Sequence, residues 1–297
     1  MGLIAQLIAN GIIAGAIYAL VALGYTMVYG ILKFINFAHG EVFMIGAYIG
    51  WVLFTFLGVP LWLSFIISMV GTAFIGILIE KIAYKPLRHA SRLAPLITAI
   101  ALSIFLQSLA LLIFGSDIKT FRTGEIVPGH QILGAVVTNT QFLIIGVAVG
   151  LMVLLHLYIK YSKLGKAMRA TADNLEVAKL IGINTDKIIT IVFAIGSALA
   201  AAGGILIGIE QNLEPTMGVS IGIKAFTATV VGGIGNIYGA VLGAFMIGLV
   251  ENLGIMFIPS GYKDAIAFFI LIIFLIFKPQ GLFGEKRETD IRKSGEI

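Results

Sequence analysis

The segment "VVGGIGNIYGA", Val230 to Ala240, interrupts an apolar stretch that extends over about residues 219–258. Four of its residues disfavour a continuous helix: Gly232, Gly233, Gly235 and Asn236. A glycine in a helix interior costs about 1 kcal/mol relative to alanine. We therefore expect the stretch to be broken, either as a re-entrant loop or as two tightly turned helices.

The composition around this segment is that of a membrane protein. The 297 residues are 59% hydrophobic and only 12% charged, whereas a soluble domain is usually about half apolar and about a quarter charged. At about 20 residues per crossing, the chain has room for one all-α bundle of about eight transmembrane segments with broken or re-entrant helices. We expect residues 1–297 to form a single transmembrane domain. The chain has no cysteine, which excludes disulfides and thiolate chemistry.

Apolar runs separated by charges, proline and glycine mark the expected segments. They cover approximately residues 3–28, 34–57, 60–79, 96–114, 142–159, 188–209, 219–258 and 265–277. Lys and Arg collect in the cytoplasmic connections of membrane proteins. Three parts of this chain are rich in them: the connection after residue 79, residues 160–187 and the tail 278–297.

Two other connections are poor in basic residues and are assigned to the opposite side. The first, 115–141, holds only Lys119 and Arg122, which Asp117 and Glu125 offset; the second, 210–218, has no base. The stretch 219–258 must then start and finish outside, which agrees with a break in its middle. The side of the N-terminus stays open, because three crossings before the first basic connection place it outside and a re-entrant second run places it inside.

Small residues recur at a spacing of four in several segments, which favours close packing of membrane helices. The rows are Gly11, Gly15 and Ala19; Gly46 and Gly50; Gly196, Ala200, Gly204 and Gly208; and Gly235, Gly239 and Gly243.

A second discontinuity lies in "KFINFAHGEVFMIGAYIGW", Lys33 to Trp51, where Asn36, His39 and Glu41 open an apolar run. We interpret these side chains as groups that satisfy broken backbone and line a wet cavity; direct contact with a substrate is the alternative. Both broken regions contain Phe-Met-Ile-Gly, at 43–46 and 245–248. Paired broken helices often mark the pathway of a transport protein, although chance similarity explains the shared letters equally well.

Ionisable groups at membrane depth are costly and usually face a cavity or a partner. Glu251 is the clearest case, either as a pathway or subunit-contact residue or as an interfacial glutamate paired with Lys263. We expect Lys224 to extend outward to water and Glu80 to lie at the interface. The four histidines are scattered, so no metal site is predicted.

The segment 160–187 is the only substantial domain expected on the inward-facing, basic side. Residues 167–181 contain strong helix formers, and Gly182 is a suitable stop. The segment is either a knob that fits a groove of a cytoplasmic protein or a simple interfacial connector.

Three motifs together resemble the LivH-type permeases of branched-chain amino acid ABC importers. They are "YALVALGYTMVYGILKFINFAHGEVFMIGAY" (18–48), "LGKAMRATADNLEVAKLIGINTDKI" (164–188) and "KAFTATVVGGIGNIYGAVLGA" (224–244). The resemblance covers nearly the whole chain and implies a multi-pass subunit of the bacterial inner membrane. It also implies that segment 160–187 couples to an ATPase through Arg169, Glu176, Ala178 and Gly182. Val177 stands where the Glu-Ala-Ala pattern of such permeases has its first alanine.

The resemblance further implies a second, homologous permease subunit, two ABC ATPase subunits and an extracytoplasmic substrate-binding protein, with lipid around the bundle and no nucleic acid. The chain has no phosphate-binding G-x-x-x-x-G-K-[ST] motif, so ATP and Mg²⁺ are expected on the ATPase and no cofactor in this chain. Leucine, isoleucine and valine are the expected cargo, with urea or short-chain amides as the alternative. An ATP-independent transporter is a further possibility. An intramembrane enzyme would need a catalytic constellation that the sequence does not show.

Overall fold

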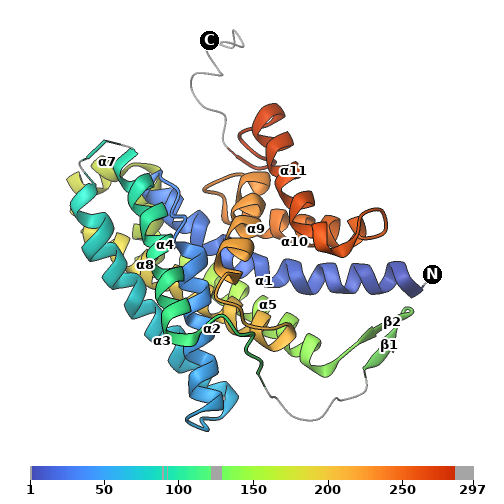
Figure 1. Ribbon diagram of the computed structural model, residues 1–297. Coiled ribbons are helices and arrows are strands. Elements are labelled where there is room, and N and C mark those ends of the chain that lie inside the picture. Colours follow the sequence, from blue (N-terminus) through green and yellow to red (C-terminus); the bar gives the residue numbers. More distant parts are fainter. Residues whose placement is uncertain (1, 89, 92, 122–128, 285–297) are drawn as a thin grey trace.

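The structure is a computed structural model that describes residues 2–88, 90–91, 93–121 and 129–284 (Figure 1). The predictions for Arg92, Arg122, Glu125 and the tail beyond residue 284 lie outside the described residues. The main helices are α1 Gly2–Leu32, α2 His39–Thr55, α3 Leu61–Ile79, α4 Leu93–Phe114, α5 Asn139–Tyr161, α6 Lys163–Asp173, α7 Leu175–Leu180, α8 Thr185–Glu210, α9 Met217–Gly232, α10 Ile237–Gly254 and α11 Lys263–Phe277. Short helical turns span Glu80–Tyr84, Lys85–Leu87 and Ser260–Tyr262. An antiparallel hairpin joins β1 His130–Ile132 to β2 Ala135–Val137, with Gln131 opposite Val136.

The all-α bundle predicted from the sequence is confirmed. In the described part of the chain, seven helices are long and apolar enough to cross a membrane, and α2 and α9 are shorter, with 17 and 16 residues. The starts of these helices follow local signals. Thr138 and Gln141 form a reciprocal capping box at the start of α5, and Pro60 precedes α3.

The predicted break in 219–258 consists of two tightly turned helices. Gly233 and Gly235 have φ angles of 111° and 96°, in a region that side chains other than glycine rarely enter. Asn236 then caps α10, because its side-chain oxygen accepts a hydrogen bond from the Gly239 amide at 3.0 Å. The α9 and α10 backbones touch where Gly232 meets Gly239, so neither position has room for a side chain.

The two ends of the bundle differ in charge. The basic connections gather at one end, here called the basic end, where Lys85, Arg88, Arg169 and Lys179 border one cavity. The α1 start lies at the other end, here called the opposite end, where the Gln6 side chain bonds Val136 of the β-hairpin. The chain therefore starts on the side away from the basic connections, and three crossings precede the first of them.

Helix α1 passes through the middle of the bundle (Figure 1) and is held there by its row of small residues. A Cβ on Gly15 would lie 2.8 Å from the Phe245 Cα of α10. Likewise, a Cβ on Gly46 of α2 would lie 2.5 Å from the Ala201 Cα of α8. The packing role predicted for these rows is confirmed at Gly15 and Gly46, whereas Gly235 lies in the turn between α9 and α10. The glycine of each Phe-Met-Ile-Gly segment faces a neighbouring helix.

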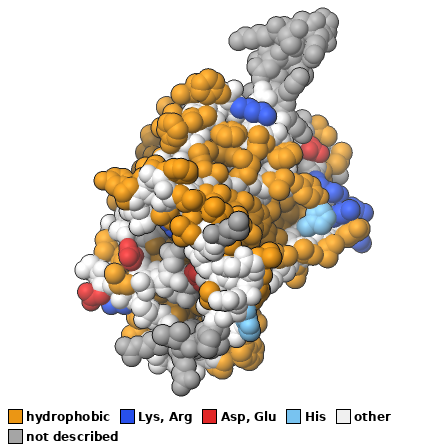
Figure 2. Space-filling view, turned by 90° about the vertical axis from the view of Figure 1, so that its right-hand side faces the viewer, with side chains coloured by type: hydrophobic (Ala, Val, Ile, Leu, Met, Phe, Trp, Pro, Cys, Tyr) orange, Lys and Arg blue, Asp and Glu red, His pale blue; other side chains and the backbone are white. Residues whose placement is uncertain are grey.

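The outer helices present apolar side chains to the exterior, as the face in Figure 2 shows. Within the apolar windows of α4 and α11, only 17% and 6% of the residues are buried. Ile104 and Leu112 of α4 are among the exposed side chains. Such surfaces are stable against lipid and unstable in water, which agrees with a multi-pass membrane protein.

The prediction of one helix over 167–181 is wrong at Asn174. The Asn174 backbone is extended, and its side-chain oxygen accepts hydrogen bonds from the Glu176 and Val177 amides at 3.0 Å each. Asparagine competes with a continuing helix in this way and starts a new one. The expected stop is confirmed, since Gly182 has a φ of 87° just beyond α7.

We expect Gly248→Leu to destabilise the bundle strongly. A side chain there would overlap the Gly11 backbone oxygen and lie 2.6 Å from the Gly15 amide, so α1 and α10 would separate. Overpacking typically costs about 1–3 kcal/mol, and contact with backbone places this site at the upper end. Thermal unfolding in detergent measures the loss. Gly146→Leu is the matched control, because a Cβ at Gly146 meets nothing within 4 Å; equal losses in both variants would contradict the packing assignment.

Candidate functional site

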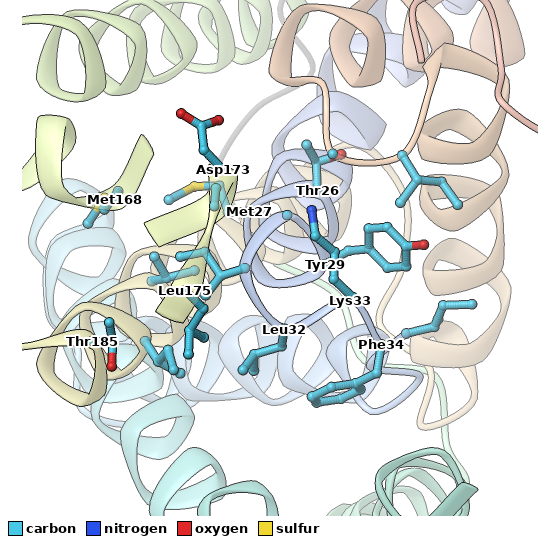
Figure 3. Close-up of a pocket in the computed structure, with 18 of the residues that line it drawn as sticks. Thr26, Met27, Tyr29, Leu32, Lys33, Phe34, Met168, Asp173, Leu175 and Thr185 are labelled. Atoms are coloured by element: carbon cyan, nitrogen blue, oxygen red, sulfur yellow. The ribbon is translucent and has the colours of Figure 1, made fainter. Parts of the chain in front are cut away.

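A cavity of about 1540 Å³ lies at the basic end and is bordered by both helix breaks (Figure 3). Residues 33–35 of the first break and 234–236 of the second contribute to its wall. Met168 and Asp173 of α6 and Leu175 of α7 contribute as well. The two discontinuities, about 200 residues apart in the sequence, thus meet at one space beside the basic connection.

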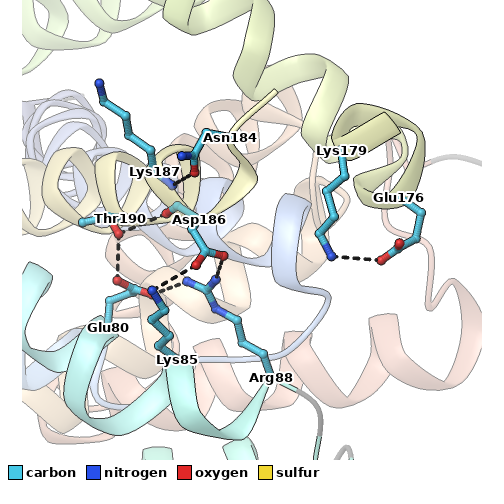
Figure 4. Close-up of polar contacts among 9 residues, drawn as sticks. All are labelled: Glu80, Lys85, Arg88, Glu176, Lys179, Asn184, Asp186, Lys187 and Thr190. Carbon is cyan, nitrogen blue, oxygen red and sulfur yellow. Dashed lines mark hydrogen bonds and ion pairs between the residues drawn. The ribbon is translucent and has the colours of Figure 1, made fainter. Parts of the chain in front are cut away.

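An ion-pair network fixes one wall of this cavity (Figure 4). Arg88 bonds Glu80 and also Asp186 of α8, with an Nη1 to Oδ1 distance of 2.6 Å. Lys85 reaches the same aspartate at 2.9 Å, and the Thr190 hydroxyl donates to Glu80 at 2.9 Å. Glu80 is fully buried within the protein. Its neighbour Lys81 is exposed, and Arg88 compensates the charge instead. The network ties the end of α3 to the start of α8.

The polar residues of the first break hold the bundle together from inside. Asn36 accepts a hydrogen bond of 2.6 Å from the Tyr84 hydroxyl, which joins the break to the turn after α3. The His39 ring lies edge-on to Tyr25, with ring centroids 4.8 Å apart. Asn36, His39 and Glu41 are buried and line neither this cavity nor the one at the opposite end. The expectation that they line a wet cavity is therefore wrong for both cavities, because the α2 start packs into the core.

Glu41 occupies the meeting point of two helix starts. It lies in the first turn of α2, and its carboxylate abuts Gly218 in the first turn of α9. Ser103 of α4 donates to one carboxylate oxygen at 3.3 Å, whereas the other, buried oxygen has no hydrogen-bond partner among the described residues. Helix N-termini favour negative charge, so the two converging dipoles compensate a carboxylate there.

A second cavity, of about 780 Å³, lies at the opposite end between α1, α9, α10 and α11. In its wall the Lys224 ammonium lies 2.6 Å from Glu251 and 2.8 Å from Asp264. The Tyr18 hydroxyl donates to the other Glu251 oxygen at 3.1 Å. The expectation that Lys224 extends outward is wrong, and so is the pairing of Glu251 with Lys263, which bonds Asn252 instead.

The residues predicted for ATPase coupling lie on the exterior of the basic end. Arg169 is exposed on α6, and Glu176 forms an exposed ion pair of 3.2 Å with Lys179 on α7. Ala178 is the buried exception and anchors α7. Around it, Val177, Leu180 and Ile181 expose apolar side chains, with 86% of Leu180 accessible. Unlike α4, this short helix carries charges among its apolar groups, which is typical of a protein-binding ridge.

Sequence reasoning missed several participants in these arrangements, chiefly Tyr18 and Asp264 at one end and Arg88 and Asp186 at the other, and it misassigned the role of Lys224. One available signal was the presence of opposite charges in two apolar helices joined by a tight turn, as with Lys224 and Glu251. Because an isolated charge inside a membrane bundle is costly, two such charges of opposite sign tend to form an ion pair. Nothing in the sequence indicated the contributions from α1 and α11.

Seven long apolar helices in the described residues, two internal breaks and a cavity at each end define a polytopic membrane protein of the permease class. Residues 7–275 match the family described as "Branched-chain amino acid transport system / permease component". The chain belongs to this family.

Sequence similarity to the relatives extends over almost the full chain. It is 44% identical to the high-affinity branched-chain amino acid transport system permease protein BraD of Pseudomonas aeruginosa, over 94% of this chain and 95% of that protein. It is 42% identical to the corresponding LivH protein of Escherichia coli K12, over 93% and 94% of the two chains. The fold also resembles a chain of PsaBC from Streptococcus pneumoniae, with a TM-score of 0.51, 17% identity and coverage of 91% and 92%.

Proposed function

We propose that this protein is the inner-membrane permease subunit of an ATP-driven bacterial importer for leucine, isoleucine and valine. The observation that carries the ATP-driven mechanism is the position of α7. Its exposed ridge stands beside a cavity that both helix breaks border, so a protein bound to α7 acts directly on the pathway walls. The cargo is supported by the names of BraD and LivH.

In this proposal the basic end faces the cytoplasm and the opposite end faces outward, in keeping with the distribution of Lys and Arg. Two ABC ATPase subunits bind ATP and Mg²⁺ and contact the exposed coupling residues Arg169, Glu176 and Gly182, while buried Ala178 anchors α7. A second, homologous permease completes the pathway, and an extracytoplasmic binding protein delivers cargo to the opposite end. This chain supplies no catalytic group and no cofactor.

The driving free energy comes from the preference of ATP for the closed ATPase dimer. Closure moves α6 and α7, which contact α8, and the network of Glu80, Arg88 and Asp186 passes that motion from α8 to α3. The cavities then open alternately to the two sides, as in other rocking-bundle transitions. The breaks at Gly232, Gly233, Gly235 and Asn236, and at Asn36, His39 and Glu41, let helix segments move separately, while Glu251 ties α10 to α9 and α1 at the opposite end.

The test is uptake by proteoliposomes that contain this chain with its partner permease, ATPase and binding protein. We expect leucine to accumulate only with ATP inside the vesicles, and urea not to accumulate. If the vesicles take up urea or short-chain amides but not leucine, the assignment of leucine, isoleucine and valine as the cargo is wrong. Leucine uptake by vesicles with this chain alone would instead indicate an ATP-independent transporter.

We expect the double substitution His39→Ala and Glu41→Ala to impair transport or assembly while the chain still inserts in the membrane. Both side chains are buried where α1, α2 and α9 meet, and truncation of large buried groups costs about 2–5 kcal/mol. Uptake and membrane-fraction yield measure the two effects. The control is the double variant His130→Ala with Asp117→Ala, because both of these side chains are exposed. If the variant that lacks His39 and Glu41 shows normal uptake, the first break is an ordinary helix start.

A further inference from the structure

The opposite-end cavity combines an apolar wall with groups of both charges. Its volume of about 780 Å³ falls within the range of about 300–1,000 Å³ that is usual for small-molecule sites. The apolar wall includes six aliphatic or methionine side chains: Ile13, Ala14, Ile17, Ile207, Met217 and Ile221. This wall is suited to a small aliphatic side chain.

The charged groups of the cavity do not all neutralise one another. Lys224 is held by Glu251 and Asp264. Glu210 accepts a hydrogen bond of 2.8 Å from the Gln141 amide, and neither Glu210 nor Glu214 forms an ion pair with any described Lys or Arg. These two acids therefore give the cavity free acceptors for a cation.

The ammonium group of Lys263 borders the same cavity. Lys263 donates to the Asn252 side-chain oxygen at 3.3 Å and forms no ion pair within the described part of the chain. Asn252 is itself buried and bonds the Gly248 carbonyl, so it orients the lysine without neutralising it. Among the described residues, one cavity thus offers two carboxylates and an ammonium that form no ion pair, beside an aliphatic wall.

We propose that this cavity is an entry site for a zwitterionic α-amino acid with an aliphatic side chain. The ammonium of the amino acid binds Glu210 and Glu214, its carboxylate binds Lys263, and its side chain lies on the wall formed by Ala14, Met217 and Ile221. The inference rests on the proposed function and deepens it, because it assigns the cargo a place in this subunit. Urea carries no charge and no aliphatic group, so it would leave these partners unused.

The test is direct binding of leucine to the full chain in lipid nanodiscs, followed by saturation-transfer NMR. Charge-assisted hydrogen bonds contribute strongly to recognition, so we expect about tenfold or greater weakening with Glu210→Gln plus Glu214→Gln, and similarly with Lys263→Met. Lys263→Arg should retain binding. The amine 3-methylbutylamine and the acid 4-methylpentanoate, each lacking one charge of leucine, should bind more weakly than leucine, and urea should give no signal.

Lys187→Met and Asp117→Asn, both exposed outside this cavity, are the matched controls and should bind leucine like the wild type. The proposal is overturned if the cavity variants also bind like the wild type, or if either one-charge analogue or urea equals leucine. Failure of the proposed function looks different. In that case the isolated chain binds leucine through these residues, but the assembled importer shows no ATP-dependent leucine uptake.

Discussion

Replacing Leu180 with aspartate is expected to abolish ATP-driven uptake while the membrane bundle stays folded. Leu180 is 86% exposed at the end of α7, so its substitution removes almost no internal contact. If α7 docks in an ATPase groove, Leu180 becomes buried there, and a charge in its place is left unpaired. Central interface residues contribute about 2 kcal/mol or more, which corresponds to about a 30-fold loss of ATPase affinity.

The measurement is the affinity of the purified ATPase for the permease in nanodiscs, together with uptake by the assembled importer. Leu133→Asp is a matched control, because Leu133 is 95% exposed at the tip of the β-hairpin at the opposite end. This control should bind the ATPase like the wild type. Undiminished ATPase affinity in the Leu180 variant, or an equal loss in the Leu133 variant, would contradict the coupling role of α7.

Lys224→Met is expected to cause the largest loss of stability. Lys224 compensates Glu251, only 2% of whose side chain is exposed, and also Asp264. Without it, Tyr18 is the one remaining side-chain partner of Glu251 among the described residues. Removal of one member of a buried ion pair costs about 3–5 kcal/mol, because the other charge is stranded. Thermal unfolding in detergent measures the change.

A second substitution separates the stranded charge from simple loss of packing. Adding Glu251→Gln to Lys224→Met removes the uncompensated carboxylate and should restore most of the stability. Lys179→Met is the surface control, since its partner Glu176 is 78% exposed and such pairs contribute about 0–1 kcal/mol. No rescue in the double variant, or a loss as large at Lys179, would refute the compensation of Glu251 by Lys224.

The sequence predicted the features that depend on backbone chemistry. Gly233 and Gly235 indicated the break between α9 and α10 because few other residues adopt their φ angles, and Gly182 indicated the end of α7. The rows of small residues predicted close helix contacts because lipid-embedded helices associate through them. Helix ends and packing faces are local properties, so one sequence suffices to find them.

Features that depend on the direction of a side chain in the assembled bundle were not predictable in the same way. From the sequence alone, Lys224 is expected to extend to water. In the folded bundle, α10 and α11 place the carboxylates of Glu251 and Asp264 beside it. His39 and Glu41 read as cavity residues until the α2 start is seen to pack against α1 and α9. The role of Asn174 as the N-cap of α7 was not predicted, because the residues on both sides of it are strong helix formers.

Alternating access of the two cavities is the central claim, and cysteine accessibility tests it most directly. The chain has no native cysteine, so Tyr29→Cys reports on the basic-end cavity and Thr216→Cys on the opposite-end cavity. The rate of reaction with a hydrophilic maleimide is measured in the assembled importer, without nucleotide and with a non-hydrolysable ATP analogue. Alternating access predicts that the analogue slows labelling at position 29 and accelerates it at position 216. Rates that change in the same direction, or that do not respond to nucleotide, would contradict it.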